Sequence, residues 1–258
     1  MLPKPGPGTL LRIALGALGL FVSLPSARPA EKPPCEAVTE ADRQYTICVF
    51  DARKDRLRLF LAGADGKPYG GFHAIAEAVK SQGGSLAFAM NAGMFGTDFR
   101  PVGLYVEGGR QLRPANTRRG SGNFHMMPNG IFYFGNESAG IMETSRFLQS
   151  GLHPEYATQS GPMLVINGAL HPKIEATGTS EKIRNGVGVR DGHIVIFAIS
   201  DEPVTFYGFA TLFRDRLHCP NALFLDGSVS SLYAPNFGRD DTLLPLGPIV
   251  GVVEKAEQ

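Results

Sequence analysis

The sequence has no surplus of charge of either sign, because 25 Lys and Arg residues face 24 Asp and Glu residues in a chain of 258. Without a positive excess there is no basic surface to neutralise nucleic-acid phosphates, so we expect no nucleic-acid partner. There is no run of roughly 18 or more apolar residues, which excludes a polytopic membrane protein. The three cysteines form no Cys-x-x-Cys motif and no cluster with histidine, so we expect no metal and no cofactor.

What the sequence does contain is a globular composition rich in glycine. Hydrophobic residues make up 43% of the chain, which excludes intrinsic disorder. The 32 glycines are about 12% of all residues, against roughly 7% in average proteins, and they predict many tight turns. Since no composition break and no internal repeat occurs between residues 35 and 255, we predict a single domain over residues 35–258.

Residues 1–27 are predicted to be a signal peptide. Lys4 and Arg12 precede an apolar stretch over residues 13–24, and small residues follow at Ser26 and Ala27. An uncleaved anchor is the alternative and would be the one membrane contact that we expect, although this stretch is short for a bilayer. Three prolines within residues 28–34 predict a short tether. We therefore expect an exported protein, periplasmic or secreted.

Export would place the three cysteines, Cys35, Cys48 and Cys219, in an oxidising compartment. A disulfide between Cys35 and Cys48 would attach the new N-terminus to the first strand. Disulfide geometry cannot be derived from spacing, so the sequence leaves open whether these two cysteines pair.

The body of the chain is predicted to be mostly antiparallel sheet with a few packed helices. Strands are expected over residues 45–51, 57–61, 86–90, 193–199, 222–225 and 249–253, and helices over 72–80 and 209–217. Gly108-Gly109, Asn167-Gly168 and Asp191-Gly192 predict hairpins, because both central residues of a type I′ turn need positive φ. The predicted fold class is α+β, in a single domain.

Two polar residues stand where predicted buried strands end. Asp226 follows the apolar run 222–225 and precedes Gly227 and a group of serines. Asn91 follows the run 86–90 and precedes Ala92-Gly93. Side chains at strand ends often converge on a cleft, so both are candidates for chemistry. An Asp-Gly turn capped by serines and an ordinary Asn turn are the structural alternatives.

Two further motifs carry polar residues beside glycine. Arg184 and Asn185 open the segment RNGVGV, and the planar guanidinium of an arginine matches phosphate or carboxylate oxygens. The run Thr158-Gln159-Ser160-Gly161-Pro162 leads polar side chains into a rigid bend. A solvent-exposed arginine and a plain loop are the corresponding structural alternatives.

In their order along the chain, the segments AMNAGMF, ATQSGPMLVINGAL, RNGVGV and ALFLDGSVSS resemble the phosphodiester glycosidase family, over roughly residues 45–253. Asn91 and Gly93 match its Asn-Gly-Gly-Phe-Phe motif, Gly161 and Pro162 its Gly-Pro turn, Arg184 its Arg-Thr-Ala motif, and Asp226, Gly227, Ser230 and Ser231 its Leu-Asp-Gly-Gly-Gly-Ser-Ser motif. The chain departs from these motifs at Ala92, Asn185, Ser228 and Val229.

The resemblance implies hydrolysis of a sugar 1-phosphodiester, which releases the sugar and leaves the phosphate on the other partner. A phosphomonoester is a good leaving group, so donors that hold the phosphate matter more than a general acid. The candidate catalytic residues are Asp226, Arg184 and Asn91, and the candidate substrate-binding residues are Gly93, Ser160, Gly161, Asn185, Gly227, Ser230 and Ser231. The expected partner is a carbohydrate or glycan-phosphate of the envelope or the extracellular space.

Several alternatives stay open at this point. A non-catalytic envelope protein could bind a glycan or glycan-phosphate in the same pocket, since Ser228 and Val229 replace glycines. A serine hydrolase is disfavoured because residues 227–231 do not form Gly-x-Ser-x-Gly, and a metal-dependent phosphodiesterase would need clustered Asp and His ligands. Further candidates are Glu107 and Glu181 as second carboxylates, and a polar stretch that could line the cleft or be a solvated loop, with Arg118, Arg119, His125 and Asn129.

Overall fold

The structure, a computed structural model, describes residues 1–4, 34–241 and 244–255. The predicted signal peptide and tether span residues 1–34. Of these, residues 5–33 lie outside the described part of the chain. The described residues from Pro34 onward belong to one compact unit, and the description below concerns that unit. Among the described residues, no helix has the length and apolar character needed to cross a membrane.

Seven antiparallel strands form the first sheet, which begins at the N-terminal hairpin. Its strands lie in the order β1 (Cys35–Glu40), β2 (Arg43–Asp51), β13 (Ile194–Ser200), β12 (Asn185–Arg190), β14 (Asn221–Phe224), β10 (Met163–Ile166) and β11 (Ala169–Leu170). Cys35 and Cys48 face each other across β1 and β2 and form a disulfide, which answers the question that the sequence left open. Cys219 is free and buried.

Two five-stranded antiparallel sheets complete the described strands. The second sheet has the order β16 (Arg239–Asp240), β15 (Leu232–Ala234), β4 (Gly84–Asn91), β17 (Ile249–Lys255) and β3 (Leu57–Phe60). The third has the order β6 (Arg110–Arg113), β5 (Tyr105–Glu107), β9 (Tyr156–Ser160), β7 (Gly130–Gly135) and β8 (Ser138–Glu143). The helices are α1 (Phe72–Ser81), α2 (Thr144–Ser150) and α3 (Phe206–Thr211), the last continued by a π-helical turn over Leu212–Arg216.

The three sheets enclose one aromatic core. Phe197 of the first sheet lies with its ring centroid 4.9 Å from that of Phe88 in the second sheet and 6.0 Å from that of Phe132 in the third. All three rings are buried, and burial of one such side chain contributes about 2 kcal/mol. This shared core holds the ends of strands from different sheets in fixed positions.

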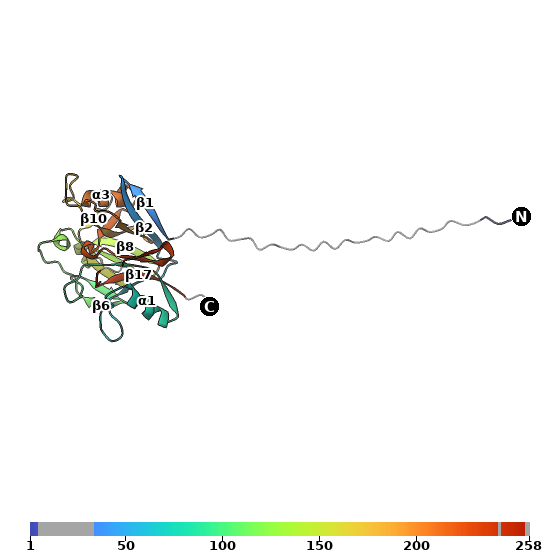
Figure 1. The fold of residues 1–258 in the computed structure, drawn as a ribbon, viewed down its shortest axis with the longest axis horizontal. Coiled ribbons are helices and arrows are strands. Elements are labelled where there is room, and N and C mark those ends of the chain that lie inside the picture. Colours follow the sequence, from blue (N-terminus) through green and yellow to red (C-terminus); the bar gives the residue numbers. More distant parts are fainter. Residues whose placement is uncertain (5–33, 242–243, 256–258) are drawn as a thin grey trace. The chain divides into compact units, whose positions relative to one another are not determined.

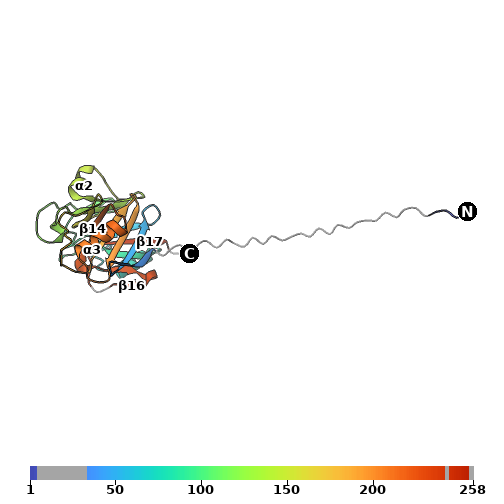
Figure 2. The same cartoon turned by 90° about the horizontal axis from the view of Figure 1, so that it is seen from above.

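Helices cover the outer faces of the sheets (Figures 1 and 2). Helix α1 packs on the second sheet through Phe72, Ile75 and Val79. Helix α3 and its π turn pack on the first sheet, where the glycines of RNGVGV make room. A Cβ on Gly186 would lie 3.1 Å from the Phe209 ring, and one on Gly188 would lie 2.7 Å from the Phe213 ring. The two glycines therefore let this helix approach β12 closely.

The predicted α+β class and the predicted hairpins are confirmed. Both central residues have positive φ in each of the turns Gly108-Gly109, Asn167-Gly168 and Asp191-Gly192. The turns connect β5 to β6, β10 to β11 and β12 to β13. The predicted helices at 72–80 and 209–217 correspond to α1 and to α3 with its π turn.

The interpretation of residues 158–162 as a plain loop is wrong for its first three residues. Thr158, Gln159 and Ser160 belong to β9, which lies between β5 and β7 and is buried along its whole length. The sequence does not predict this strand, because its side chains are polar and buried polar residues are uncommon outside hydrogen-bonded networks.

Candidate active site

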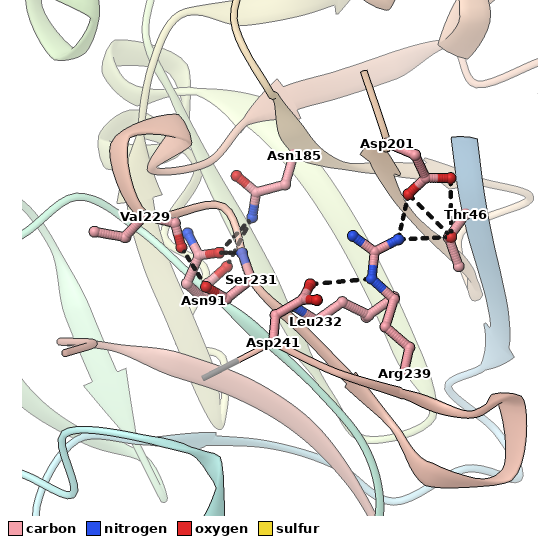
Figure 3. Close-up of polar contacts among 9 residues, drawn as sticks. All are labelled: Thr46, Asn91, Asn185, Asp201, Val229, Ser231, Leu232, Arg239 and Asp241. Carbon is pink, nitrogen blue, oxygen red and sulfur yellow. Dashed lines mark hydrogen bonds and ion pairs between the residues drawn. The ribbon is translucent and has the colours of Figure 1, made fainter. Parts of the chain in front are cut away.

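Strand β4 ends at Asn91, whose side chain is buried and fully engaged by neighbouring segments (Figure 3). Its Nδ2 donates to the backbone oxygen of Asp226 at 2.8 Å. Its Oδ1 accepts from Nδ2 of Asn185 at 2.8 Å and from the backbone amide of Ser231 at 2.9 Å. Asn91 thus connects the end of β4, the start of β12 and both ends of the loop 226–231.

The serines of this loop extend the same hydrogen-bonded cluster. Ser230 Oγ donates to Asn185 Oδ1 at 3.3 Å, and Ser231 Oγ donates to the backbone oxygen of Val229 at 2.8 Å. The structure therefore brings together Asn91, Asn185, Asp226, Ser230 and Ser231, from three separate motifs. The hydrogen bonds fix the backbone course of the loop that carries the aspartate.

Asp226 follows β14 and lies against the segment that leaves β4. Its backbone amide donates to the Ala92 oxygen at 3.2 Å, and its Oδ1 accepts from the Ser228 amide at 3.1 Å. Burial raises the pKa of the Asp226 carboxyl above its usual 3.8, while hydrogen bonds from Ser228 and the Phe95 backbone act in the opposite direction. A half-buried carboxyl with a raised pKa at a strand end is a candidate for acid–base or nucleophilic chemistry.

Arg184 lies just before β12 and is only 2% exposed. Its guanidinium stacks on Phe206, with Cζ 3.6 Å from the ring centroid. Nε donates to the Val204 oxygen at 2.9 Å, and Nη2 donates to the Ser180 oxygen at 2.8 Å. Within the described ranges no carboxylate pairs with it, and burial alone lowers the pKa of Arg184 from 12.5 to about 10. Arg184 is therefore a buried cation at neutral pH whose remaining N–H groups are available to an anion.

A cavity of about 410 Å³ lies beside Arg184 and is called the anion cavity below. Its lining combines the cations Arg184 and Lys182, the polar residues Asn123, Ser180 and Ser228, the backbone of Gly227, and the apolar side chains of Ile183, Phe206 and Phe224. These lining residues include no carboxylate. Gly227 and Ser228 follow Asp226 directly, so the wall of the cavity begins where the aspartate loop begins.

Three glycines of the predicted site stand where a side chain would collide. A Cβ on Gly93 would lie 2.4 Å from Thr158 Oγ1, one on Gly227 would lie 2.4 Å from the Phe224 ring, and one on Gly161 would lie 2.7 Å from Asn129 Cβ. Gly93 therefore lets the segment after Asn91 pack on β9. Gly227 lets the aspartate loop pass over the phenylalanine that lies beneath Arg184.

Of the candidate site residues from the sequence, only Arg184 and Gly227 line the anion cavity, and Asp226 directly precedes its wall. Ser160 is fully buried in β9, and its hydroxyl has no hydrogen-bond partner within the described part of the chain. Glu181 forms an exposed ion pair with Arg43 at 3.3 Å. Glu107 accepts from Tyr105 Oη at 3.0 Å, and burial raises its pKa. Val229, which replaces a glycine of the family motif, packs against the apolar cluster of α1 and the second sheet and is not a lining residue of the anion cavity.

Sequence reasoning missed Lys182, Phe206 and Asn123 as lining residues. Lys182 stands two positions before Arg184, which was a signal available in the sequence. Phe206 and Asn123 come from distant segments without a motif, and only the fold shows that they face the same cavity.

Comparison with known proteins places the chain in a family. The family model for phosphodiester glycosidases matches residues 84–248, a range that contains Asn91, Arg184 and Asp226. The chain belongs to the phosphodiester glycosidase family. The chain is also similar to the uncharacterised protein YigE of Escherichia coli (strain K12), with 35% identity over 189 residues, which are 73% of this chain and 72% of YigE.

Solved structures share the fold at low sequence identity. The catalytic domain of zebrafish N-acetylglucosamine-1-phosphodiester α-N-acetylglucosaminidase, auto-inhibited by its pro-peptide, is similar with a TM-score of 0.58 and 14% identity, over 87% of this chain and 85% of that one. A Burkholderia pseudomallei protein described as exported is similar with a TM-score of 0.56 and 11% identity, over 81% of this chain and 74% of that one. These likenesses support the three-sheet architecture of this family member.

Proposed function

We propose that the protein is an exported hydrolase that cleaves the glycosyl–phosphate bond of a sugar 1-phosphodiester. One observation carries the proposal: Arg184 is buried without a carboxylate partner and lines a cavity whose wall continues into the Asp226 loop. A buried cation normally has an anionic partner, and a phosphodiester would supply one. Membership of the phosphodiester glycosidase family supports a phosphodiester as the anion.

In the proposed reaction, water replaces the phosphate at the anomeric carbon. The bond between C1 and its phosphate oxygen breaks, and that oxygen stays on phosphorus. The oxygen of the water forms the new bond to C1, and one proton of the water is lost to the carboxylate or to solvent. The leaving group is a phosphomonoester, whose charge Arg184 would stabilise through its free N–H groups. Asp226 would assist at the anomeric carbon as a carboxylate.

The amides and hydroxyls of the cluster have a positioning role in this proposal. Asn91 uses both ends of its side chain on protein groups and is 1% exposed, so we assign it to holding the Asp226 loop rather than to substrate. Asn185, Ser230 and Ser231 belong to the same network. Gly227 and Ser228 offer the backbone and hydroxyl of the cavity wall to the substrate.

The direct test is incubation of the purified protein with N-acetylglucosamine 1-(methyl phosphate) and other sugar 1-phosphodiesters, followed by measurement of free reducing sugar. Release by the wild type and loss in Asp226→Asn would support the proposal. Saturable binding of these diesters without any release would favour the non-catalytic alternative. Neither binding nor release across the panel would reject both.

The proposal of export rests on three observations. The first 27 residues have the pattern of a signal peptide, the Cys35–Cys48 disulfide is typical of oxidising compartments, and one structural relative is described as exported. Cell fractionation with N-terminal sequencing of the mature protein tests it. Recovery of an uncleaved chain from the cytoplasm would contradict it.

A further inference from the structure

A second cavity, of about 380 Å³, is lined by polar residues that the proposed reaction does not use: Thr117, Arg119, Asn129, Glu143, Thr144 and Ser145. We infer that this cavity is a subsite for a neutral sugar unit of the substrate, beyond the bond that is cleaved. The inference rests on the proposed function and narrows its substrate class to glycans of more than one unit. We call the cavity the glycan subsite.

The glycan subsite contains one positive and one negative side chain, Arg119 and Glu143, and the two do not form an ion pair in the described residues. Glu143 accepts from Ser145 Oγ at 2.6 Å, and Arg119 has no hydrogen-bond partner in the described part of the chain. An unpaired guanidinium and a carboxylate in one cavity offer strong donors and acceptors to hydroxyl groups, with no net charge to attract an ion.

Apolar surface completes the lining. Met127 and Pro128 form part of the same wall. A pyranose ring presents hydroxyl groups at its rim and C–H groups on its faces, so it matches a site with polar groups around an apolar wall. The cavity also has the size of small-ligand sites in proteins.

A buried amide, that of Gln159, connects segments that line the glycan subsite. Gln159 Oε1 accepts from the Asn116 amide at 2.8 Å, and its Nε2 donates to the Asn116 oxygen at 2.8 Å. This paired bond holds the loop that carries Thr117 and Arg119. Gln159 Nε2 also donates to Thr144 Oγ1 at 3.2 Å, and Thr144 Oγ1 donates to Asn129 Oδ1 at 2.8 Å. Lining groups that are fixed before binding lose little conformational entropy when a ligand binds.

The glycan subsite adjoins the anion cavity through Gly161. A Cβ on Gly161 would lie 2.7 Å from Cβ of Asn129, which lines the glycan subsite, and 3.2 Å from the backbone oxygen of Asn123, which lines the anion cavity. Asn129 Nδ2 also donates to the Phe124 oxygen at 2.9 Å, next to Asn123. One substrate with a phosphate at Arg184 and a further sugar unit could therefore occupy both cavities.

A glycan array tests the subsite without catalysis. We expect the wild type to bind a set of neutral oligosaccharides, Arg119→Gln and Glu143→Gln each to lose about tenfold or more in affinity, as for a lost charged hydrogen bond, and Arg184→Met to keep the pattern. Arg113→Gln is the matched control, because Arg113 is an exposed arginine on β6 outside both cavities. No binding of any neutral glycan, or an unchanged pattern in both subsite variants, would overturn the inference.

Kinetics then separate this inference from the proposed function. The best-bound glycan is esterified with N-acetylglucosamine 1-phosphate and compared with N-acetylglucosamine 1-(methyl phosphate). We expect Arg119→Gln to lower kcat/KM about tenfold on the glycan ester, through KM, and to leave the methyl ester within about twofold. Equal losses on both esters would overturn the subsite. Cleavage of neither ester by the wild type would refute the proposed function, while the array result would still decide whether the cavity binds sugar.

Discussion

Two arginines of this molecule, Arg184 and Arg239, differ in whether carboxylates pair with them. Arg239 is 20% exposed in its side chain and pairs with two carboxylates: Nη1 contacts Asp201, and Nε lies 3.0 Å from Asp241 Oδ2 (Figure 3). Nη1 also donates to Thr46 Oγ1 at 2.8 Å. Arg184 is more deeply buried, yet it has no carboxylate within the described part of the chain.

Under the proposed function, Arg239 belongs to the architecture and Arg184 is reserved for a ligand. Arg239 connects β16 with β2 and with Asp201, which follows β13, and Asp241 Oδ2 accepts from the Leu232 amide next to Ser231. Its charge is satisfied by the protein. The charge of Arg184 is desolvated without a matching anion, which costs stability and is retained where a ligand supplies the partner.

The largest effect is expected at Asp226, whose loop continues into the wall of the anion cavity. Asp226→Asn should reduce turnover of a sugar 1-phosphodiester on the order of 10³-fold, because the amide cannot assist at the anomeric carbon. Thermal stability at neutral pH should not fall, since burial disfavours the charged form of Asp226. Enzyme assays and calorimetry measure the two quantities. Asp98→Asn, an exposed control, should change neither, and a fully active Asp226→Asn would exclude the assigned role.

Arg184→Met should show the next largest effect, and it should be confined to activity. We expect kcat/KM on phosphodiesters to fall about 10²-fold, as for a lost charge-stabilising donor, with a smaller loss on uncharged aryl glycosides. The hydrogen bonds lost to two carbonyl groups are offset by removal of a desolvated charge, so the melting temperature should change little. Arg190→Met, at the other end of β12, is the control. Equal losses on both substrates would argue against a phosphate contact.

Arg239→Met should show the reverse pattern. It leaves Asp201 and Asp241 without their cation, and we expect a loss of about 1–3 kcal/mol in the free energy of unfolding. Chemical denaturation measures this loss, and kcat per folded molecule should stay within about twofold of the wild type. A stable Arg239→Met protein with strongly reduced kcat would contradict the assignment of Arg239 to stability and Arg184 to activity.

The smallest expected effect is a displacement of the acidic limb of the pH–rate profile. Because burial raises the pKa of Asp226, the carboxylate needed for turnover is lost at a pH above 3.8 as the solution is acidified. The same raised pKa means that Asp226 contributes stability at low pH, which is lost as the pH rises through its folded-state pKa. Profiles of kcat/KM and melting temperature against pH test both signs. An acidic limb below 3.8 would contradict the buried carboxylate.

Local sequence patterns predicted much of this fold. The Asn-Gly, Asp-Gly and Gly-Gly pairs require positive φ at adjacent residues, and that requirement is local enough to place hairpins. The strand ends at Asn91 and Asp226 followed from apolar runs that stop at a polar residue. The side-chain network that joins them could not be derived, because Asn91 and Asp226 bond across 135 positions of sequence.

The remaining features depend on tertiary packing. Gln159 looks like a loop residue in the sequence but organises the wall of the glycan subsite from inside a buried strand. Asp241, two residues after Arg239, is a local signal for an ion pair, and Arg184 has no acidic residue at that spacing. The second counterion of Arg239, Asp201, comes from a distant segment and could not be derived from the sequence. Phe206 joins Arg184 only because α3 packs on the first sheet.

The central claim is that Arg184 binds an anionic ligand. Calorimetric titration tests it, with N-acetylglucosamine 1-phosphate as the ligand at neutral pH and low salt. The account predicts saturable binding by the wild type and by Arg190→Met, with a rise in melting temperature as ligand is added, and loss of both in Arg184→Met. Equal affinity in Arg184→Met and the wild type, or no binding by either protein, would contradict it.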